Sequence, residues 1–446
     1  MIQSGPERIK AAATPLPPIT DKSFTSHFDF LGSSRVVLLG DASHGTSEFY
    51  QARAEVTKRI IMHHGFKMVA LEADWPDAEC IDRYVRQRPG PKTSIERDDS
   101  ADDSFKRFPT WMWRNAEMQE FVHWLRDFNA TLSPKKRVGV YGLDLYSLGA
   151  SMHAVIRYLD SVDPNLAQVA RRRYACLEPW LEEPTDYGLA HRMMRDFESC
   201  EHHVMVMLRD LLKKRLEYSS LHGDGEEFHS AEQNARLLAD AEHYYRSIYR
   251  ADTSSWNLRD THMFETLKRL MDFRGEKAVV WAHNSHCGDA RHTGMRYRGE
   301  LNIGQLCRNE WKDQVTIVGT GTHTGTVAAA DHWDGDMKVM PINPSRKDSW
   351  ERQAHDTGLS RFLLNMHDED KLDCELHDYL CESKLERFIG VIYRPDTERA
   401  SHYSEASLGR QFDALMWFDE TSAVKPLERK QPKTPLAFNE TYPFGL

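Results

Sequence analysis

Short apolar runs recur along the chain, and most of them end at Gly, Asp, Asn or His. Their content of Val, Ile and aromatic residues is typical of buried strands. Continuous apolar runs that alternate with helical segments predict parallel strands covered by helices on both faces. The runs are RVVLLG (35–40), KMVALEAD (67–74), RVGVYGLD (137–144), KAVVWAHN (277–284), QVTIVGTGTHTG (314–325), RFIGVIYRP (387–395) and ALMWFDE (414–420).

The segments between these runs have helical patterns. Residues 47–65 follow the first run and end at Gly65, which is typical of a helix C-cap. Aromatic residues at helical spacing in 111–130 indicate a helix that forms part of the core or the wall of a cleft. Between about 150 and 275 the pattern is nearly all helical, without a convincing strand.

These patterns predict an α/β fold with a mixed, mostly parallel central sheet flanked by helices. We expect a single domain over residues 1–446, with 150–275 as a helical insertion within it. Single α/β enzymes reach this length when they carry insertions. Two polar segments lie between the expected elements: 90–104 is expected to be a mobile loop, and 221–227 an exposed turn.

The charge balance limits the classes of partner. The chain has 58 Lys and Arg against 68 Asp and Glu, which gives a formal net charge of −10. This balance provides no basic footprint for nucleic acid and favours solubility. The N-terminal residues lack a signal-peptide core, and no apolar run approaches the roughly 20 residues that span a bilayer. We therefore expect a cytoplasmic protein that binds neither nucleic acid nor membrane.

The cysteines give no sign of a stapled or zinc-binding fold. Their number is odd, their spacing is scattered and no CxxC occurs, so neither a zinc knuckle nor a disulfide framework is predicted. A reducing compartment fits this usage best. The seven are Cys80, Cys176, Cys200, Cys287, Cys307, Cys374 and Cys381.

Acidic and imidazole side chains follow several of the predicted strands. Ligands of open α/β sheets bind beyond the carboxyl ends of the strands, so these side chains are expected to converge at one edge. In chain order the strands deliver Asp41 and His44, then Glu72 and Asp74, then Asp144, then His283 and His286, and finally His323.

His44 lies in GDASHG, between a predicted strand and a predicted helix. Such a turn exposes a side chain at the sheet edge, and Gly40 and Gly45 suit its tight backbone. An imidazole with an ordinary pKa of about 6.5 takes a proton from water near neutral pH. The alternative is a buried histidine that hydrogen-bonds to a neighbour, and position alone does not separate the two.

Glu72 and Asp74 leave the second strand on the same face. A carboxylate beside an imidazole fixes its tautomer and stabilises its protonated form, and we favour this role for Glu72. Asp74 precedes Trp75-Pro76, which is typical of a helix N-cap; it is also a candidate for substrate binding.

His283 and His286 are three residues apart in WAHNSH. Such a pair could bind a metal, stabilise an oxyanion or carry protons, but HxxH alone is a weak zinc signal. Two polar residues in an ordinary strand-end loop are the alternative. The chain has no GxSxG elbow, P-loop or full GxGxxG, so an ordinary serine hydrolase is disfavoured and no cofactor is predicted.

Two arginines are candidates for substrate binding. Arg53 lies nine residues after His44, on the following helix, and Arg259 lies in NLRDTHM, on a helix before the fourth strand. A guanidinium at the site would bind a carboxylate or a developing oxyanion. Both could instead form surface ion pairs.

Several long blocks, in the same order, resemble the erythromycin esterase family from about residue 30 to about residue 430. They are VVLLGDASHGTSEFYQARAEVTKRII, VALEADWPDAECIDRYV, FPTWMWRNAEMQEFVHWLR, VYGLDLYSL, NLRDTHMFETL, KAVVWAHNSHCGD and IYRPDTERASHYSEASLGRQFDALMWFDET.

The resemblance implies an α/β core with a cleft beside helical segments, and hydrolysis of esters or macrolactones by water without a required metal. His44 then matches the histidine that activates water. One departure is Asp41, where the family often has Glu; the shorter side chain changes the reach of the carboxylate. Erythromycin itself is not implied as the substrate. The other matched positions are Arg53, Glu72, Arg259, His283 and His286.

Three hypotheses follow. In the first, a water between His44 and Glu72 attacks an ester or lactone, while the histidines after the fourth strand and the arginines stabilise the oxyanion or protonate the leaving group. In the second, Asp41, His44, Glu72 and His283 hold a metal that assists hydrolysis. In the third, the chain binds or rearranges a small molecule without hydrolysing it.

Overall fold

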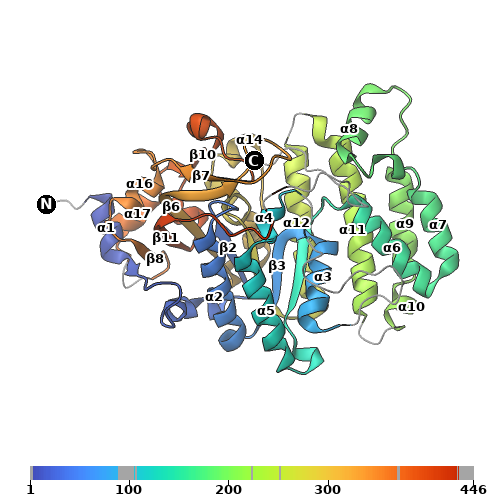
Figure 1. Cartoon of the computed structure of the whole chain (residues 1–446), viewed down its shortest axis with the longest axis horizontal. Helices are drawn as coiled ribbons and strands as arrows, with labels where there is room; N and C mark the ends of the chain where they lie inside the picture. Colours follow the sequence, from blue (N-terminus) through green and yellow to red (C-terminus); the bar gives the residue numbers. More distant parts are fainter. Residues whose placement is uncertain are drawn as a thin grey trace.

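A central sheet of nine strands organises the chain in the computed structural model. The structure describes residues 4–88, 105, 108–221, 225–250, 253–368, 372–428 and 430. The strand order is β1-β8-β11-β6-β2-β5-β3-β4, and β7 pairs with β6. Neighbouring strands from β11 to β4 are parallel, whereas β8, β1 and β7 join antiparallel. The mixed, mostly parallel α/β sheet predicted from the sequence is confirmed (Figure 1).

Six of the seven predicted strands are present. Three further strands of the sheet were not predicted: β1 (Thr14–Pro15), β7 (Lys338–Ile342) and β8 (Arg361–Asn365). The confirmed strands are β2 (Val36–Asp41), β3 (Phe66–Asp74), β4 (Gly139–Asp144), β5 (Lys277–His283), β6 (Val315–Ala329) and β11 (Ala414–Thr421).

The prediction of a core strand at 387–395 is wrong. The observed strand is β9 (Lys384–Arg387), which pairs with β10 (Tyr403–Ala406) in a separate two-stranded sheet and forms one bridge from Leu385 to Ser349. Beyond it, Ile389 and Ile392 form single bridges to Ser43 and Ala330. The segment is apolar because it is buried against the loop after β2 and the end of β6, and not because it belongs to the sheet.

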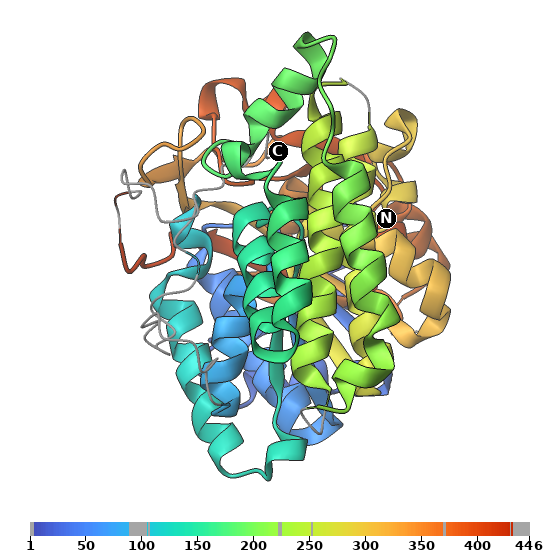
Figure 2. The ribbon, with the colours of Figure 1, turned by 90° about the vertical axis from the view of Figure 1, so that its right-hand side faces the viewer.

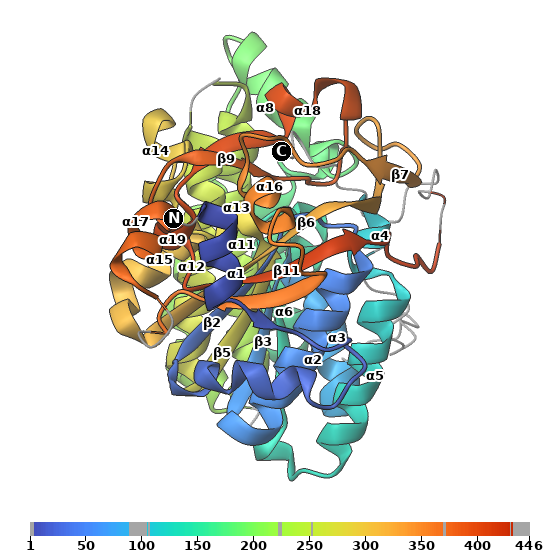
Figure 3. The ribbon, with the colours of Figure 1, turned by 90° about the vertical axis from the view of Figure 1, so that its left-hand side faces the viewer.

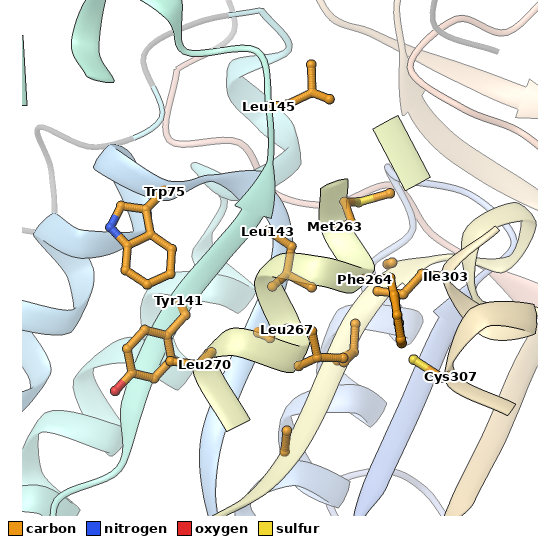
Figure 4. Packing of buried hydrophobic residues seen from close by; sticks show 14 of the residues in the cluster. Trp75, Tyr141, Leu143, Leu145, Met263, Phe264, Leu267, Leu270, Ile303 and Cys307 are labelled. Atoms are coloured by element: carbon orange, nitrogen blue, oxygen red, sulfur yellow. The ribbon is translucent and has the colours of Figure 1, made fainter. Parts of the chain in front are cut away.

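Alternation along the strands divides the core into two layers. Val37 and Leu39 face the cluster formed with α2 (Ser47–His64), α3 (Trp75–Arg86) and α5 (Ala116–Ala130). Val36 and Leu38 face the opposite cluster, with α12 (Ser254–Arg274) and α15 (Ile303–Trp311). Figure 4 shows part of this second layer, where side chains of α12 pack between β4 and α15.

The predicted helices are present with one change. Residues 47–64 form α2, and Gly65 ends it in the left-handed conformation with φ of 74°, as expected of a C-cap. The helix expected at 111–130 is split into α4 (Thr110–Trp113) and α5. Asn115 separates them because its side chain caps α5 by accepting a hydrogen bond from the Met118 amide at 2.7 Å.

Between β4 and β5 the described residues form helices and no strand. α11 packs against α6, α9 and α12, and the apolar cluster runs without a break from these helices to the sheet. Figure 2 shows the long helices of this region side by side. The α-helices described in this region are α6 (Leu148–Val162), α7 (Pro164–Tyr174), α8 (Pro184–Met193), α9 (Glu201–Lys213), α10 (Arg215–Ser219), α11 (Glu226–Ser247) and α12.

One pair of cysteines is bridged, although the scattered spacing of the cysteines predicted no disulfide framework. Cys176, just after α7, and Cys200, just before α9, form a disulfide with Cα atoms 6.0 Å apart. They are 24 residues apart in sequence, and their proximity arises only when α7 and α9 pack together.

The other end of the sheet carries the first and last parts of the chain. β1 pairs with β8, and β8 pairs with β11. α1 (Gly5–Ala12) contacts α16 (Trp350–His355) and α17 (Cys374–Leu380) at this end, which Figure 3 views directly.

Two predicted loops fall largely outside the described residues: all of 90–104, and 222–224 within the expected turn at 221–227. Among the helices that are described, none is long and apolar enough to cross a membrane.

Candidate active site

Four neighbouring parallel strands bring the predicted residues together. β5 lies between β2 and β3, and in this register Asp41 is opposite His283. Glu72 of β3 accepts a hydrogen bond from the backbone amide of His283 at 2.8 Å through Oε2. Asp144 ends β4 next to them. His323 does not join this cluster: it stacks on His355, with ring centroids 3.6 Å apart, and contacts Ser345.

His44 lies in the turn between β2 and α2. The turn is tight, because a Cβ at Gly40 would collide with the Asn284 side chain and one at Gly45 with the backbone of Ala328. Tyr50 donates to the His44 carbonyl at 3.0 Å, and the His44 amide donates to Ile389 at 3.3 Å. The backbone on both sides of the imidazole is thereby fixed.

The two ring nitrogens of His44 face two carboxylates. Nδ1 is 3.4 Å from Asp41 Oδ1, and Nε2 is 4.0 Å from Glu72 Oε1. The His283 ring lies 4.8 Å away, centroid to centroid. Asp41 is therefore the nearest acceptor for an Nδ1 proton, which leaves Nε2 directed at Glu72.

Arg53 is fully buried beneath Asp41, with Nη1 2.5 Å from Asp41 Oδ2. Its guanidinium lies between the rings of Tyr50 and Trp281, at 4.6 and 5.1 Å from their centroids. Burial alone would raise the pKa of Asp41, but Arg53 and His44 hold it below its usual range. Asp41 is thus an anion in the interior.

Glu72 is the most heavily connected carboxylate of the cluster. Its Oε1 accepts from Arg259 Nη2 at 2.7 Å and lies 3.2 Å from His286 Nε2. Burial opposes ionisation of Glu72, yet His286, His44 and Arg259 keep its pKa well below the usual value.

Arg259 of α12 binds carboxylates at the ends of two strands, β3 and β4. It binds Asp144 through two hydrogen bonds, at 3.0 Å from Nε and 2.8 Å from Nη2, in the fork geometry that guanidinium groups favour. Its face packs on Tyr146 at 5.0 Å. At 9% exposure Arg259 is the most accessible of the clustered side chains, followed by His44 at 5%, so solvent reaches the cluster on this side.

His286 lies between two carboxylates. Its Nδ1 is 2.9 and 3.0 Å from the two oxygens of Asp260, and its Nε2 faces Glu72. The Trp256 ring stacks on it at 4.7 Å with an interplanar angle of 7°. Burial would lower the pKa of His286, but Asp260 and Glu72 outweigh burial and raise it to about 9.

His283 has the opposite character. Burial, reinforced by His44, lowers its pKa to about 3, so the ring is neutral. Nδ1 lies 2.8 Å from the Ser285 hydroxyl and 3.4 Å from the Ser285 amide, which donates to it. The proton therefore resides on Nε2, and this buried atom has no hydrogen-bond partner.

Asp74 occupies the N-cap position of α3, with a proline in the first turn, as its sequence context indicated. Its carboxylate does not cap that helix. It accepts from the amides of Tyr146 at 2.8 Å and Ser147 at 3.1 Å, and so holds the loop that follows β4.

Sequence reasoning did not single out Asp260 or Trp256. Both lie on α12: Asp260 directly follows Arg259, and Trp256 is about one turn earlier. The available signal was the adjacent Arg259-Asp260 pair near the start of a helix. The structure buries both charges, and buried charges require partners. The partners themselves come from β3, β4 and the turn after β5.

Across the described ranges, no group of three or more His, Cys, Asp or Glu side chains is arranged to hold a metal ion. The clustered carboxylates are instead occupied by arginine and histidine.

The family model for erythromycin esterase matches residues 61–421, which include Glu72, Arg259, His283 and His286. The chain belongs to the erythromycin esterase family. Membership supports a hydrolase of the esterase type. The match begins after Asp41, His44 and Arg53, so the assignment of those three rests on the geometry described above.

Individual relatives are distant in sequence. Erythromycin esterase type II of Escherichia coli is 21% identical over 331 residues, covering 67% of this chain and 71% of the relative. Erythromycin esterase type I of the same species is 20% identical over 356 residues, with 75% and 83% covered. A mutant of erythromycin esterase EreC in its open conformation superimposes with a TM-score of 0.65 at 14% identity, covering 92% and 97%, and shares the fold.

Proposed function

We propose that this chain hydrolyses a carboxylic ester or lactone with water activated by His44. The observation that carries the proposal is the 4.0 Å separation between His44 Nε2 and Glu72 Oε1. It is too long for a direct hydrogen bond, whereas one water at about 2.8 Å from each atom spans it.

The proton arrangement supports a general base. With Nδ1–H directed at Asp41, His44 Nε2 accepts a proton from the water. Glu72 remains an anion because Arg259 and His286 are bound to it, so it orients the second proton of the water without taking it. The water oxygen then attacks the ester carbonyl.

The attack places negative charge on the carbonyl oxygen. His283 Nε2–H is buried without a partner, next to the His44 ring, and supplies a neutral hydrogen-bond donor for this oxygen. Arg259 adds positive charge from the more accessible side of the cluster. When the intermediate collapses, the bond to the leaving oxygen breaks and protonated His44 returns its proton to that alkoxide. The products are a carboxylic acid and an alcohol.

Arg53 and Asp74 support the site from behind. Arg53 is fully buried and holds Asp41, and Asp74 holds the loop after β4. We assign both as positioning residues, and no direct contact with substrate is proposed for either.

The test is hydrolysis of a panel of aryl esters and lactones by the purified chain, by His44→Ala and by His323→Ala. His323 is a buried histidine outside the cluster and is the matched control. We expect His44→Ala to lose at least about 10²-fold in kcat, and the control to keep its activity. Full activity in His44→Ala would reject the base assignment.

A second arm addresses metal-assisted hydrolysis. Activity that disappears with a chelator and returns with one stoichiometric metal ion would replace the water-activation scheme by a metal one. No turnover of any ester or lactone would reject hydrolysis of this substrate class.

A further inference from the structure

Neither ring nitrogen of His286 is available to contact a substrate. Its two ring nitrogens face Asp260 and Glu72 at 2.9 and 3.2 Å, and Trp256 covers one face of the ring. The histidine itself is 3% exposed. A side chain enclosed in this way cannot transfer a proton to an alkoxide without first losing one of these contacts.

We propose that Asp260 is a positioning residue that keeps His286 a cation at neutral pH, so that His286 holds Glu72 in place and takes no part in proton transfer. The inference deepens the proposed function, because it divides the two histidines after β5 between two roles. His283 is the hydrogen-bond donor to the substrate, and His286 is part of the frame that holds the water-binding carboxylate.

The groups around His286 determine whether its ring is protonated. Glu72 from β3 and Asp260 from α12 favour the imidazolium, and the face of Trp256 adds a cation–π contact. Arg259 from α12 opposes it, with Nη1 3.1 Å from Nε2, and His283 from β5 faces the same cluster as a neutral ring. Two carboxylates outweigh one guanidinium, so the protonated form of His286 is favoured.

Asp260 is itself held in place. Its Oδ1 accepts a hydrogen bond from the Ile303 amide at 2.9 Å. The carboxylate is therefore anchored to the start of α15 as well as to its own helix. The contact fixes the direction in which the carboxylate meets His286. A movement of α12 relative to α15 would therefore displace the imidazolium and Glu72 together.

The same helix offers a matched control. His262, two residues after Asp260, is buried and pairs through Nδ1 with Asp240 of α11 at 2.7 Å. This second Asp–His pair contacts none of the clustered residues through a hydrogen bond. Asp240→Asn therefore removes an aspartate from a histidine on α12 without touching the proposed machinery.

The experiment is an NMR titration of ring nitrogens in the full chain, with the His286 signal assigned by its loss in His286→Gln. In the wild type we expect His286 to stay protonated beyond pH 8. Asp260→Asn should lower its midpoint by roughly one pH unit or more, and Asp240→Asn should not move it. A wild-type His286 that titrates near pH 6.5 would overturn the proposal without any variant.

Kinetics give the second readout. Asp260→Asn should lower kcat by roughly tenfold or more, keep KM within about threefold because Asp260 does not touch substrate, and add a new loss of activity on the alkaline side. Asp240→Asn should keep the wild-type profile. Unchanged kcat and pH profile in folded Asp260→Asn would contradict the positioning role.

The two proposals fail separately. If the wild type hydrolyses no ester, the proposed function falls, while the NMR titration still decides whether His286 is a fixed cation.

Discussion

The two sides of the candidate site satisfy their polar atoms to different degrees. On the side of β2, the three guanidinium nitrogens of Arg53, Asp41 Oδ1, His44 Nδ1 and His283 Nε2 are buried without a well-formed hydrogen bond. Asp41 is held there by charge, 2.5 Å from Arg53 and 3.4 Å from His44. On the side of α12, Glu72 and Arg259 are bound on several atoms, and His286 is bound on both nitrogens. Buried polar groups are nearly always paired in proteins, so unpaired ones require a reason.

The difference separates residues that react from residues that hold. Arg53, Asp41 and His44 Nδ1 are held to one another by charge, which leaves His283 Nε2–H without an internal partner and available to a substrate. Groups that make several hydrogen bonds inside the protein position their neighbours. The β2 side thus contains the base and the donor, and the α12 side is the frame. Substitutions on the two sides should therefore be distinguishable by whether stability or turnover changes more.

The largest effect on stability is expected from Arg259→Met. It leaves Glu72 and Asp144 as buried charges without a guanidinium, which typically costs about 3–5 kcal/mol of unfolding free energy. Urea unfolding measures this change. Arg59→Met is the control, because its partner Asp29 is 40% exposed and the pair is worth about 1 kcal/mol or less. Equal losses in the two variants would contradict a frame on the α12 side.

Asp41→Asn should act on turnover more than on folding. The amide no longer selects the Nδ1–H tautomer of His44, so Nε2 loses its ability to accept a proton, and we expect kcat to fall about 10²-fold. Asp41→Glu keeps the carboxylate and should stay within about tenfold. Comparable kcat values for Asn, Glu and the wild type would remove Asp41 from the mechanism.

The pH dependence of stability should show the two histidines acting on opposite sides of pH 6.5. The pKa of His283 is lowered to about 3, so its contribution is lost as pH falls from 6.5 toward 3. The pKa of His286 is raised to about 9, so its contribution is full below pH 6.5 and is lost as pH rises through 9. Each slope is at most about 1.4 kcal/mol per pH unit.

Urea unfolding between pH 5 and 8 in the His283→Asn and His286→Asn variants checks these signs. The first variant should flatten the acid side of the stability curve and the second the alkaline side. The reverse assignment would show that the two rings have exchanged roles.

The smallest effect is expected from Tyr50→Phe. The hydroxyl contacts the carbonyls of His44 and Met112, and its loss should cost about 1 kcal/mol in unfolding free energy. Turnover should change by less than about threefold, since the His44 amide still donates to Ile389. A larger loss of kcat would show that the backbone of the turn needs both contacts.

Much of the architecture was predictable because strand ends carry their own signals. Apolar runs located six strands of the sheet, and the rule that ligands meet the carboxyl ends of parallel strands brought Asp41, Glu72 and His283 together. The run at 387–395 misled because burial against the turn after β2 produces the same composition as burial in a sheet.

The rest depends on packing between distant segments. The link from Asp260 to His286 requires α12 to dock on β5, and the Cys176–Cys200 disulfide requires α7 to meet α9. His323 was expected at the same edge because it lies in a sheet strand; instead it contacts Ser345 and His355. No local pattern in the sequence reports such contacts.

The position of β5 between β2 and β3 has a consequence for synthesis of the chain. β2 and β3 are complete by residue 74, but the strand that joins them begins at Lys277. A nascent chain of some 270 residues therefore has both edges of β2 open, and also the edge of β3 that β5 later fills. Neighbouring strands of a sheet lie about 5 Å apart, so β5 fills a gap of about 10 Å between β2 and β3. Such edges invite pairing with other chains. Ribosomal pausing or truncation before residue 283 should yield fragments that aggregate and cannot assemble His44 and Glu72 into one site.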